Sequence, residues 1–374
     1  MTTHVFIVDK NTFPVHLEFL FAGTGASDKE EHASLCADIS RLRPGDPVVF
    51  YLLGVGFFGV FRVADRPDYI FQDNGDYLFD QLRKKLIYRA FVEPARVYQL
   101  GVSEWQALDL LPLYAREVIW SLIYRKLRAN RGCTPITLEE SDRLVGMLKE
   151  WNNGNTIVLA EGETVKYNAS TLSLEGPATP SVYKGPRVWK PDYELKVTRA
   201  ILSSPIRACE SWLEGYITGN YGRNDEVRAI TGTNLIWLGN QVRCGVGMQT
   251  IDVLSICEDA RQNRVHRVIE LKDEPAEPDV CRQLSRYVEW CSCYLKDAIN
   301  ANIVPVVVGA SPRVKWKTNA SIVQHGQRMA SAFDELDAKC IAQPVQYFEF
   351  DIADGRLSFS HKRGSGNAPL LSLQ

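Results

Sequence analysis

A linker-like stretch divides this chain into two halves with different patterns, and that division restricts the folds open to it. Residues 152–192 contain the run Asn152-Asn153-Gly154-Asn155, several Ser and Thr residues, and prolines at positions 177, 180, 186 and 191. Proline and glycine interrupt helices and strands, so this composition is typical of a connector. We predict one domain over 1–150, a connector over 151–192 and a second domain over 193–374. With 374 residues, the chain is long enough for two domains that each bury a core.

The first half opens with β-rich runs. Pro47–Leu53 and Phe57–Val63 are apolar and are separated by the short connection Gly54-Val55-Gly56, which predicts a β-hairpin. Strands are also expected at His4–Val8 and Tyr88–Val92. These runs indicate a small β-rich domain.

After about residue 110 the apolar spacing becomes helical, which predicts a helix over Tyr114–Ala129. A second helix is expected after Thr137, because Glu140 stands three residues later and the two form a capping-box sequence. The β-rich domain is therefore predicted to carry a helical extension that reaches residue 150.

The second half alternates helical and strand-like segments, as α/β domains do. Its most apolar run, Ile303–Val308, is typical of a strand buried on both faces. The other expected segments are a helix over Tyr193–Gly219, strands at Asn234–Leu238, Thr250–Ile256 and Arg264–Lys272, and a helix over Asp279–Ala298.

Two neighbouring strands of this half each carry a carboxylate. Seventeen residues separate Asp252 from Glu270, and Lys272 follows Glu270 by two. Because side chains alternate along a strand, Glu270 and Lys272 are expected on one face, with Leu271 turned to the core. Taken alone, these three residues could equally be ordinary charges at strand ends.

Hydrolysis of a phosphodiester is a reaction that suits this residue set. It calls for a divalent cation that activates water and stabilises developing charge. Mg²⁺ or Mn²⁺ would be held by the carboxylates of Asp252 and Glu270 and by a backbone carbonyl, for which Leu271 is the candidate. Lys272 would position or deprotonate the attacking water, or stabilise negative charge.

Residues 205–310 resemble the PD-(D/E)xK nuclease superfamily, and most closely the archaeal NucS-type mismatch endonucleases. The resemblance rests on Leu213-Glu214, on Ile251–Leu254, on Val268–Lys272 and on Gln283–Trp290. It implies an α/β nuclease core with a mixed sheet. It also implies that Glu214 completes the metal shell, and that Gln283 and Tyr287, at i and i+4 on one helix face, hold either the substrate backbone or the residues that bind the metal. The sequence departs from the pattern after Lys272, where Asp273-Glu274 stands in place of a basic residue.

The first 110 residues resemble the EVE/YTH-like branch of the PUA superfamily. The resemblance rests on Phe6–Asn11, Asp46–Leu53 and Phe57–Val63, and it implies a β-barrel with helices. Members of that branch flip a modified base into an aromatic pocket, which requires the base to be unstacked. By position, the pocket would be lined by Lys10, Asn11, Tyr51, Phe57, Phe58 and Trp105. For the hairpin aromatics, the alternative is that they belong to the core.

Composition excludes some functions and leaves others open. The formal net charge of −2 excludes a histone-like grip on nucleic acid but permits a local basic groove. No apolar run approaches the ~20 residues of a membrane span, and residues 1–5 lack the start of a secretory signal. A cytoplasmic, prokaryotic setting without membrane association is therefore expected. Because no GxxxxGK[ST] loop occurs, no nucleotide cofactor is expected in this chain.

Together, a base reader and a nuclease predict a modification-dependent DNA restriction endonuclease. Double-stranded DNA, with a modified base such as a substituted cytosine, is the expected partner, although RNA stays open. Cutting both strands suggests a homodimer. Two alternatives remain at this point: a repair endonuclease for mismatched or branched DNA, and a non-catalytic nucleic-acid binding module.

Overall fold

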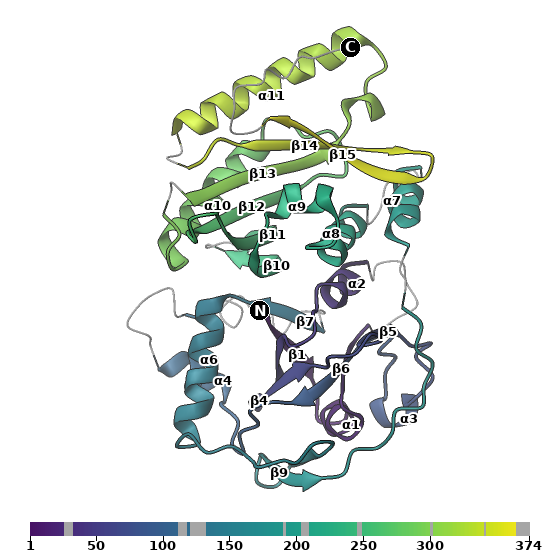
Figure 1. Ribbon diagram of the computed structural model, residues 1–374, viewed down its shortest axis with the longest axis vertical. Coiled ribbons are helices and arrows are strands. Elements are labelled where there is room, and N and C mark those ends of the chain that lie inside the picture. Colours follow the sequence, from purple (N-terminus) through teal and green to yellow (C-terminus); the bar gives the residue numbers. More distant parts are fainter. Residues whose placement is uncertain are drawn as a thin grey trace. The chain divides into compact units, whose positions relative to one another are not determined.

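The computed structural model describes residues 1–25, 33–110, 118–119, 132–189, 192–202, 209–244, 249–299, 302–339 and 342–363. The chain forms two compact units, Met1–Pro191 and Asp192–Gln374. Both units combine helices with a mixed sheet (Figure 1), so the fold is of the mixed α+β kind. None of the helices in these ranges is long and apolar enough to cross a membrane.

Unit 1 is built on a curled, seven-stranded sheet with the order β2-β6-β4-β3-β1-β7, to which β5 is added beside β6. Only β1 and β3 pair in parallel. The first and last strands of this order, β2 and β7, come close together. Gly132, next to β7, lies so near Thr24 of β2 that a Cβ on Gly132 would overlap it. The strands are β1 (Thr3–Val8), β2 (Phe21–Thr24), β3 (Pro47–Leu52), β4 (Gly56–Val63), β5 (Ile70–Gln72), β6 (Tyr88–Pro94) and β7 (Cys133–Ile136).

The hairpin that the sequence predicts is β3–β4. The capping box is also present, since Thr137 Oγ1 accepts from the N–H of Glu140 at 3.2 Å and Glu140 Oε2 accepts from the N–H of Thr137 at 2.8 Å. The helix expected over Tyr114–Ala129 falls outside the described residues, apart from residues 118–119. The helices of unit 1 are α1 (Thr12–Phe19), α2 (Ala33–Ser40), α3 (Phe79–Leu82), α4 (Glu104–Asp109) and α6 (Leu138–Trp151).

The segment 151–192 is not the free connector that its composition suggests. It contains a second small sheet, the hairpin β8 (Thr164–Asn168) and β9 (Ser173–Ala178). Val165 and Leu174 of this hairpin are fully buried, and β8 packs along α1. Farther on, Gln72 and Val188 exchange two backbone hydrogen bonds. We call residues 151–192 the strap. The strap is part of unit 1, because its buried apolar residues pack in that unit despite the linker-like composition.

Unit 2 is built on a six-stranded mixed sheet with the order β10-β11-β12-β13-β14-β15. Its three central strands, β12, β13 and β14, run parallel, and the outer pairs are antiparallel. Helices α10 and α11 connect the parallel strands, as such crossovers require. The strands are β10 (Leu235–Cys244), β11 (Gln249–Glu258), β12 (Arg264–Leu271), β13 (Ile303–Ala310), β14 (Gln346–Ala353) and β15 (Arg356–Arg363).

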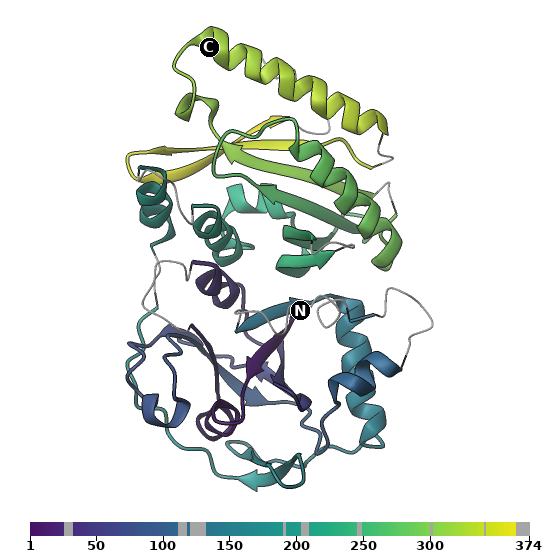
Figure 2. The same cartoon turned by 180° about the vertical axis from the view of Figure 1, so that it is seen from behind.

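Helices cover both faces of this sheet, with α9 and α10 on opposite sides (Figures 1 and 2). The single helix expected over Tyr193–Gly219 is in fact two, α7 and α8. Pro205 lies between them in the sequence, and proline cannot donate a helical hydrogen bond. The helices are α7 (Tyr193–Leu202), α8 (Cys209–Asn220), α9 (Asp225–Thr231), α10 (Val280–Tyr294), the 3₁₀ turn η5 (Pro312–Val314) and α11 (Asn319–Lys339).

Candidate active site

Asp252 and Glu270 lie at the same end of the β11–β12 strand pair. The antiparallel register, with Val253 opposite Ile269, places Asp252 near the start of β11 level with the end of β12. Both carboxylates are buried, with 8% and 2% of each residue exposed. The backbone N–H of Leu271 donates to Asp252 Oδ2 at 2.8 Å. The sheet thus holds two acids close together in a site of low solvent access.

Lys272 extends this edge by one more residue. Its N–H donates to the carbonyl of Val308 on β13 at 2.9 Å, which continues the parallel pairing of the two strands. Its Nζ lies 2.6 Å from Glu270 Oε1. Glu270 and Lys272 therefore project to one side, as the alternation of a strand requires.

The electrostatics of this cluster are dominated by burial and by like charges. Burial, together with the nearby Glu270 and Glu210 carboxyls, raises the pKa of Asp252 well above its usual value. Burial also raises the pKa of Glu270, although Lys272 acts in the opposite direction. Perturbed carboxyl pKa values of this origin are typical of functional sites.

Glu210, on the first turn of α8, is part of the same cluster, and the sequence analysis missed it. Burial is the largest cause that raises its pKa, to about 7; Lys272 counteracts the rise, and Asp273 and Glu270 add to it. Glu210 stands one helical turn before Glu214, so the i, i+4 spacing of the two acids on α8 was a signal that could have found it.

Glu214 itself is buried and bonded to amides of β10. Asn240 Nδ2 donates to its Oε1, and Gln241 Nε2 donates to its Oε2 at 2.8 Å. The same Gln241 nitrogen lies 3.4 Å from Asp252 Oδ1. Gln241 is a second residue that the sequence analysis missed, and no local pattern marks it, because its neighbours come from α8 and β11.

The two residues expected on α10 differ in their surroundings. Tyr287 is buried and its hydroxyl donates to the carbonyl of Thr250 at 2.8 Å. Burial, with Glu270 and Asp252 nearby, raises the pKa of Tyr287. Gln283, one turn earlier, is half-buried and makes no side-chain hydrogen bond to another described residue. Tyr287 therefore belongs to the wall of the site, while a role for Gln283 stays a prediction.

The donor set suits Mg²⁺ or Mn²⁺ bound through two carboxylates. Glu270 Oε2 is buried and is not met by an N–H or hydroxyl donor of a described residue, while the Asp252 carboxyl lies within hydrogen-bonding reach of Glu270, so a cation between the two carboxylates would satisfy both. No group of three or more His, Cys, Asp or Glu side chains in the described ranges is arranged to hold a metal ion. Mg²⁺ commonly takes only one or two carboxylates and keeps several waters, so Asp252 and Glu270 suffice. The roles of Glu214 and of the Leu271 carbonyl as further ligands stay predictions.

The pocket expected for a flipped base is occupied by core side chains. Tyr51, Phe57 and Phe58 are each at most 1% exposed. Tyr51 and Phe57 pack together with ring centroids 4.8 Å apart, and the Tyr51 hydroxyl bonds to Glu104. Phe58 packs on Phe13 at 5.4 Å. Tyr51 and Phe57 lie on one face of the β3–β4 hairpin and Phe58 lies on the other, and both faces are buried in unit 1. This is the core alternative that the sequence left open, and a role for these rings in binding a base stays a prediction.

The remaining residues predicted to bind a base lie on the surface. Lys10 and Asn11 are exposed, and the turn that carries them is fixed by Asp9, whose Oδ1 accepts from the N–H groups of Asn11 and Thr12 at 2.9 Å. Trp105, on α4, is 66% exposed.

No family model matches this chain, and no curated protein is similar to it in sequence. Among solved structures, it is similar to Atu2648 from Agrobacterium tumefaciens, at 12% identity with a TM-score of 0.29, over 42% of this chain and 100% of that one. It is similar to Rpa0253 from Rhodopseudomonas palustris, at 13% identity with a TM-score of 0.26, over 39% and 92% of the two chains. It is also similar to human THYN1 protein, solved in complex with DNA containing 5-methylcytosine, at 8% identity with a TM-score of 0.26, over 40% and 98%. TM-scores of this size do not establish a shared fold.

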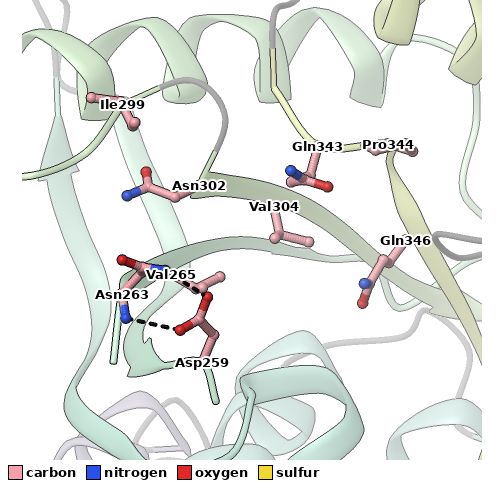
Figure 3. A pocket seen from close by; sticks show the side chains of 9 residues that line it. All are labelled: Asp259, Asn263, Val265, Ile299, Asn302, Val304, Gln343, Pro344 and Gln346. Carbon is pink, nitrogen blue, oxygen red and sulfur yellow. Dashed lines mark hydrogen bonds between the residues drawn. The ribbon is translucent and has the colours of Figure 1, made fainter. Parts of the chain in front are cut away.

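A cavity of about 530 Å³ lies at the other end of the sheet from the acids (Figure 3). It is bordered by the turn between β11 and β12 and by the starts of β12, β13 and β14, whereas Glu270 stands near the end of β12. Asp259 and Asn263 of that turn bond to each other, with Asn263 Nδ2 3.1 Å from Asp259 Oδ2. The two places differ in the direction of the pKa shift: burial raises the pKa of Asp252, Glu270 and Glu210 in the cluster, whereas hydrogen bonds from Asn263 lower the pKa of Asp259 at the cavity. The lining residues are Asp259, Asn263, Val265, Ile299, Asn302, Val304, Gln343, Pro344 and Gln346.

Proposed function

We propose that unit 2 is a metal-dependent nuclease that hydrolyses the phosphodiester backbone of DNA. The observation that carries the proposal is the buried pair Asp252 and Glu270 at one sheet edge, with Lys272 bonded to Glu270. Two acids and a lysine on one edge match the requirements of phosphodiester hydrolysis, and their order along the chain matches the PD-(D/E)xK pattern.

Each residue has a role that follows from its surroundings. Asp252 and Glu270 would hold Mg²⁺ or Mn²⁺, which supplies an activated water and stabilises charge on the phosphate. Lys272 orients Glu270 through the 2.6 Å contact and presents its ammonium at the edge, where negative charge develops on the phosphate oxygens. Gln283 would bind the substrate backbone, as the family resemblance implies, and Tyr287 supports the strand that carries Asp252 through its bond to Thr250.

Substrate choice would rest with unit 1. Its resemblance to EVE/YTH-like domains supports the recognition of a modified base, and a modification-dependent restriction endonuclease is the function that combines both units. Cutting both strands would take two such sites, so we expect a homodimer on the DNA. Repair of mismatched DNA, to which the NucS-type resemblance points, uses the same site and differs in substrate.

The test compares labelled duplexes of one sequence that are unmodified, 5-methylcytosine-modified or mismatched, each incubated with Mg²⁺ or with EDTA. The full chain is compared with Asp252→Asn and with Asp354→Asn, a control in an exposed turn where Asn tolerates the positive φ of 53°. Mg²⁺-dependent cutting of only the modified duplex, lost in Asp252→Asn alone, is the expected result. Preference for the mismatched duplex would assign the chain to repair. Binding of duplexes without cutting would leave a non-catalytic module and overturn the nuclease proposal.

A further inference from the structure

We propose that Gln241 is a positioning residue that sets the orientation of the Asp252 carboxylate, and that Glu214 acts on the site through Gln241 instead of binding the metal. This inference rests on the proposed function of unit 2 and assigns a different task to Glu214 from the one that family resemblance implies.

Gln241 faces Asp252 across the β10–β11 pair. Asn240 is opposite Val253 and Val242 is opposite Ile251, so Gln241 and Asp252 are level with each other. The Gln241 Nε2 atom lies 2.8 Å from Glu214 Oε2 and 3.4 Å from Asp252 Oδ1. One amide nitrogen is therefore shared between a carboxylate of α8 and a carboxylate of β11.

Both oxygens of Glu214 accept hydrogen bonds from β10, because Asn240 Nδ2 donates to Oε1. Glu214 is 2% exposed, so these amides take the place of water around a buried carboxylate. Because each Glu214 oxygen accepts from one of these amides, Glu214 fixes the side chains of Asn240 and Gln241 in place. The direct contact with Asp252 is made by Gln241.

Asp252 is thus held from two sides. The Leu271 N–H fixes Oδ2 at 2.8 Å, and the Gln241 amide approaches Oδ1. Each carboxylate oxygen has two lone pairs, so both oxygens keep a lone pair for a cation while the plane of the carboxylate is set. Partners of this kind orient the residues that bind metals in proteins.

The backbone of Gln241 is unusual in a way that matches this role. Its φ is 51°, in the left-handed region, within a ten-residue strand. Gln262 and Asp354 adopt the same conformation in exposed turns, whereas Gln241 adopts it inside a paired strand. Backbone strain of this kind persists where the surrounding structure fixes it. In Gln241, this backbone conformation directs the side chain between the carboxylates of Glu214 and Asp252, which both contact its amide nitrogen.

The experiment measures Mn²⁺ binding to the full chain by titration calorimetry, together with the thermal midpoint. The variants are Gln241→Leu, Gln241→Gly, Glu214→Gln, the double variant Gln241→Leu/Glu214→Gln, and Asp252→Ala. Gln262→Leu is the matched control, because Gln262 is an exposed glutamine with a φ of 63° in the same unit, at the far end of the β11–β12 pair. Gln241→Gly distinguishes the effect of losing the side-chain amide from the effect of backbone strain, since glycine adopts a positive φ without strain.

We expect Gln241→Leu and Gln241→Gly to weaken Mn²⁺ binding by roughly 10- to 100-fold, the usual effect of removing a partner that orients a metal ligand. Gln241→Gly should have the higher thermal midpoint of the two, and Gln262→Leu should bind as wild type does. The double variant should bind no more weakly than the worse single variant, because Glu214 acts through Gln241. Saturating Mg²⁺ should restore most of the cleavage rate in Gln241→Leu, since Asp252 and Glu270 are intact.

Two results would overturn the inference while the nuclease proposal stands. The first is that Gln241→Leu binds Mn²⁺ with wild-type affinity. The second is that the losses of Mn²⁺ affinity add up in the double variant, while Glu214→Gln alone binds Mn²⁺ as weakly as Asp252→Ala. Those additive losses would make Glu214 a direct ligand. A wild-type chain that binds no Mn²⁺ would instead remove the proposed function, and the assignment of Gln241 with it.

Discussion

The ammonium of Lys272 lies 2.6 Å from Glu270 Oε1, yet the two side chains differ in exposure, at 29% and 3%. The lysine reaches the surface while its partner is enclosed, so the pair connects a buried carboxylate to the edge where a substrate would arrive. Removing the lysine would leave that carboxylate buried without its counter-charge, which is more costly than the loss of an exposed ion pair.

Lys272→Met is therefore expected to abolish most cleavage. A positioned acid–base or charge-stabilising group contributes about 10²- to 10⁴-fold to a rate, and we expect a loss in that range at saturating Mg²⁺. The measurement is single-turnover cleavage of the preferred duplex. Lys339→Met, on an exposed part of α11, should cleave at the wild-type rate. Unchanged cleavage in Lys272→Met would remove this residue from the mechanism.

The acidic cluster should make stability depend on pH. The pKa of Glu210 is raised from 4.5 to about 7, chiefly by burial, so the folded chain binds a proton that the unfolded chain has lost in this range. The stability that this proton contributes is fully present below about pH 4.5 and is lost as the pH rises through about 7. We expect the free energy of unfolding in EDTA to fall over this interval, and to fall less in Glu210→Gln. Urea unfolding at a series of pH values measures it; identical slopes in the two chains would contradict the assignment.

The core position of the hairpin aromatics predicts a loss of stability. Phe57 is fully buried, so Phe57→Ala should lower the free energy of unfolding by about 3–5 kcal/mol. Trp105→Ala, at a residue that is 66% exposed, should change it by less than about 0.5 kcal/mol. Chemical denaturation of the two variants provides the comparison. If Phe57→Ala were as stable as wild type but bound modified DNA poorly, the ring would line a pocket after all.

The part of the strap after β9 is tied to the rest of unit 1 by a buried polar network. The Tyr183 hydroxyl donates to Asp73 Oδ2 at 2.5 Å and accepts from Arg89, which also forms an ion pair with Asp73. Tyr183→Phe removes the hydroxyl and leaves two charged groups with one partner fewer, at a cost of about 1–3 kcal/mol. We expect faster limited proteolysis within residues 179–189 as well as the loss of stability. Tyr167→Phe, in the neighbouring β8, serves as the comparison, and equal protease resistance in the two variants would argue against the network.

Local patterns predicted the elements that carry local signals. The β3–β4 hairpin and the Thr137 capping box follow from short-range chemistry, and strands β11, β12 and β13 follow from their apolar runs. The division into α7 and α8 was missed, because apolar spacing continues from one helix to the other. The strap was misjudged, because its proline content hid the buried Val165 and Leu174.

The candidate site was predictable where its residues are close in sequence or follow a known order. Asp252, Glu270 and Lys272 meet because β11 and β12 are neighbours, which their spacing suggests. Gln241 was not predictable, since its importance depends on a strand register and on the approach of α8. The burial of Tyr51 and Phe57 on one face of the hairpin and of Phe58 on the other likewise depends on unit 1 covering both faces.

The turn between β11 and β12 stands at the opposite end of the strand pair from the two acids. Its residues can therefore change in length and type while the geometry of the acids is preserved by the strands. That turn is therefore a suitable position for inserting a reporter, since the strand pair separates it from the acids.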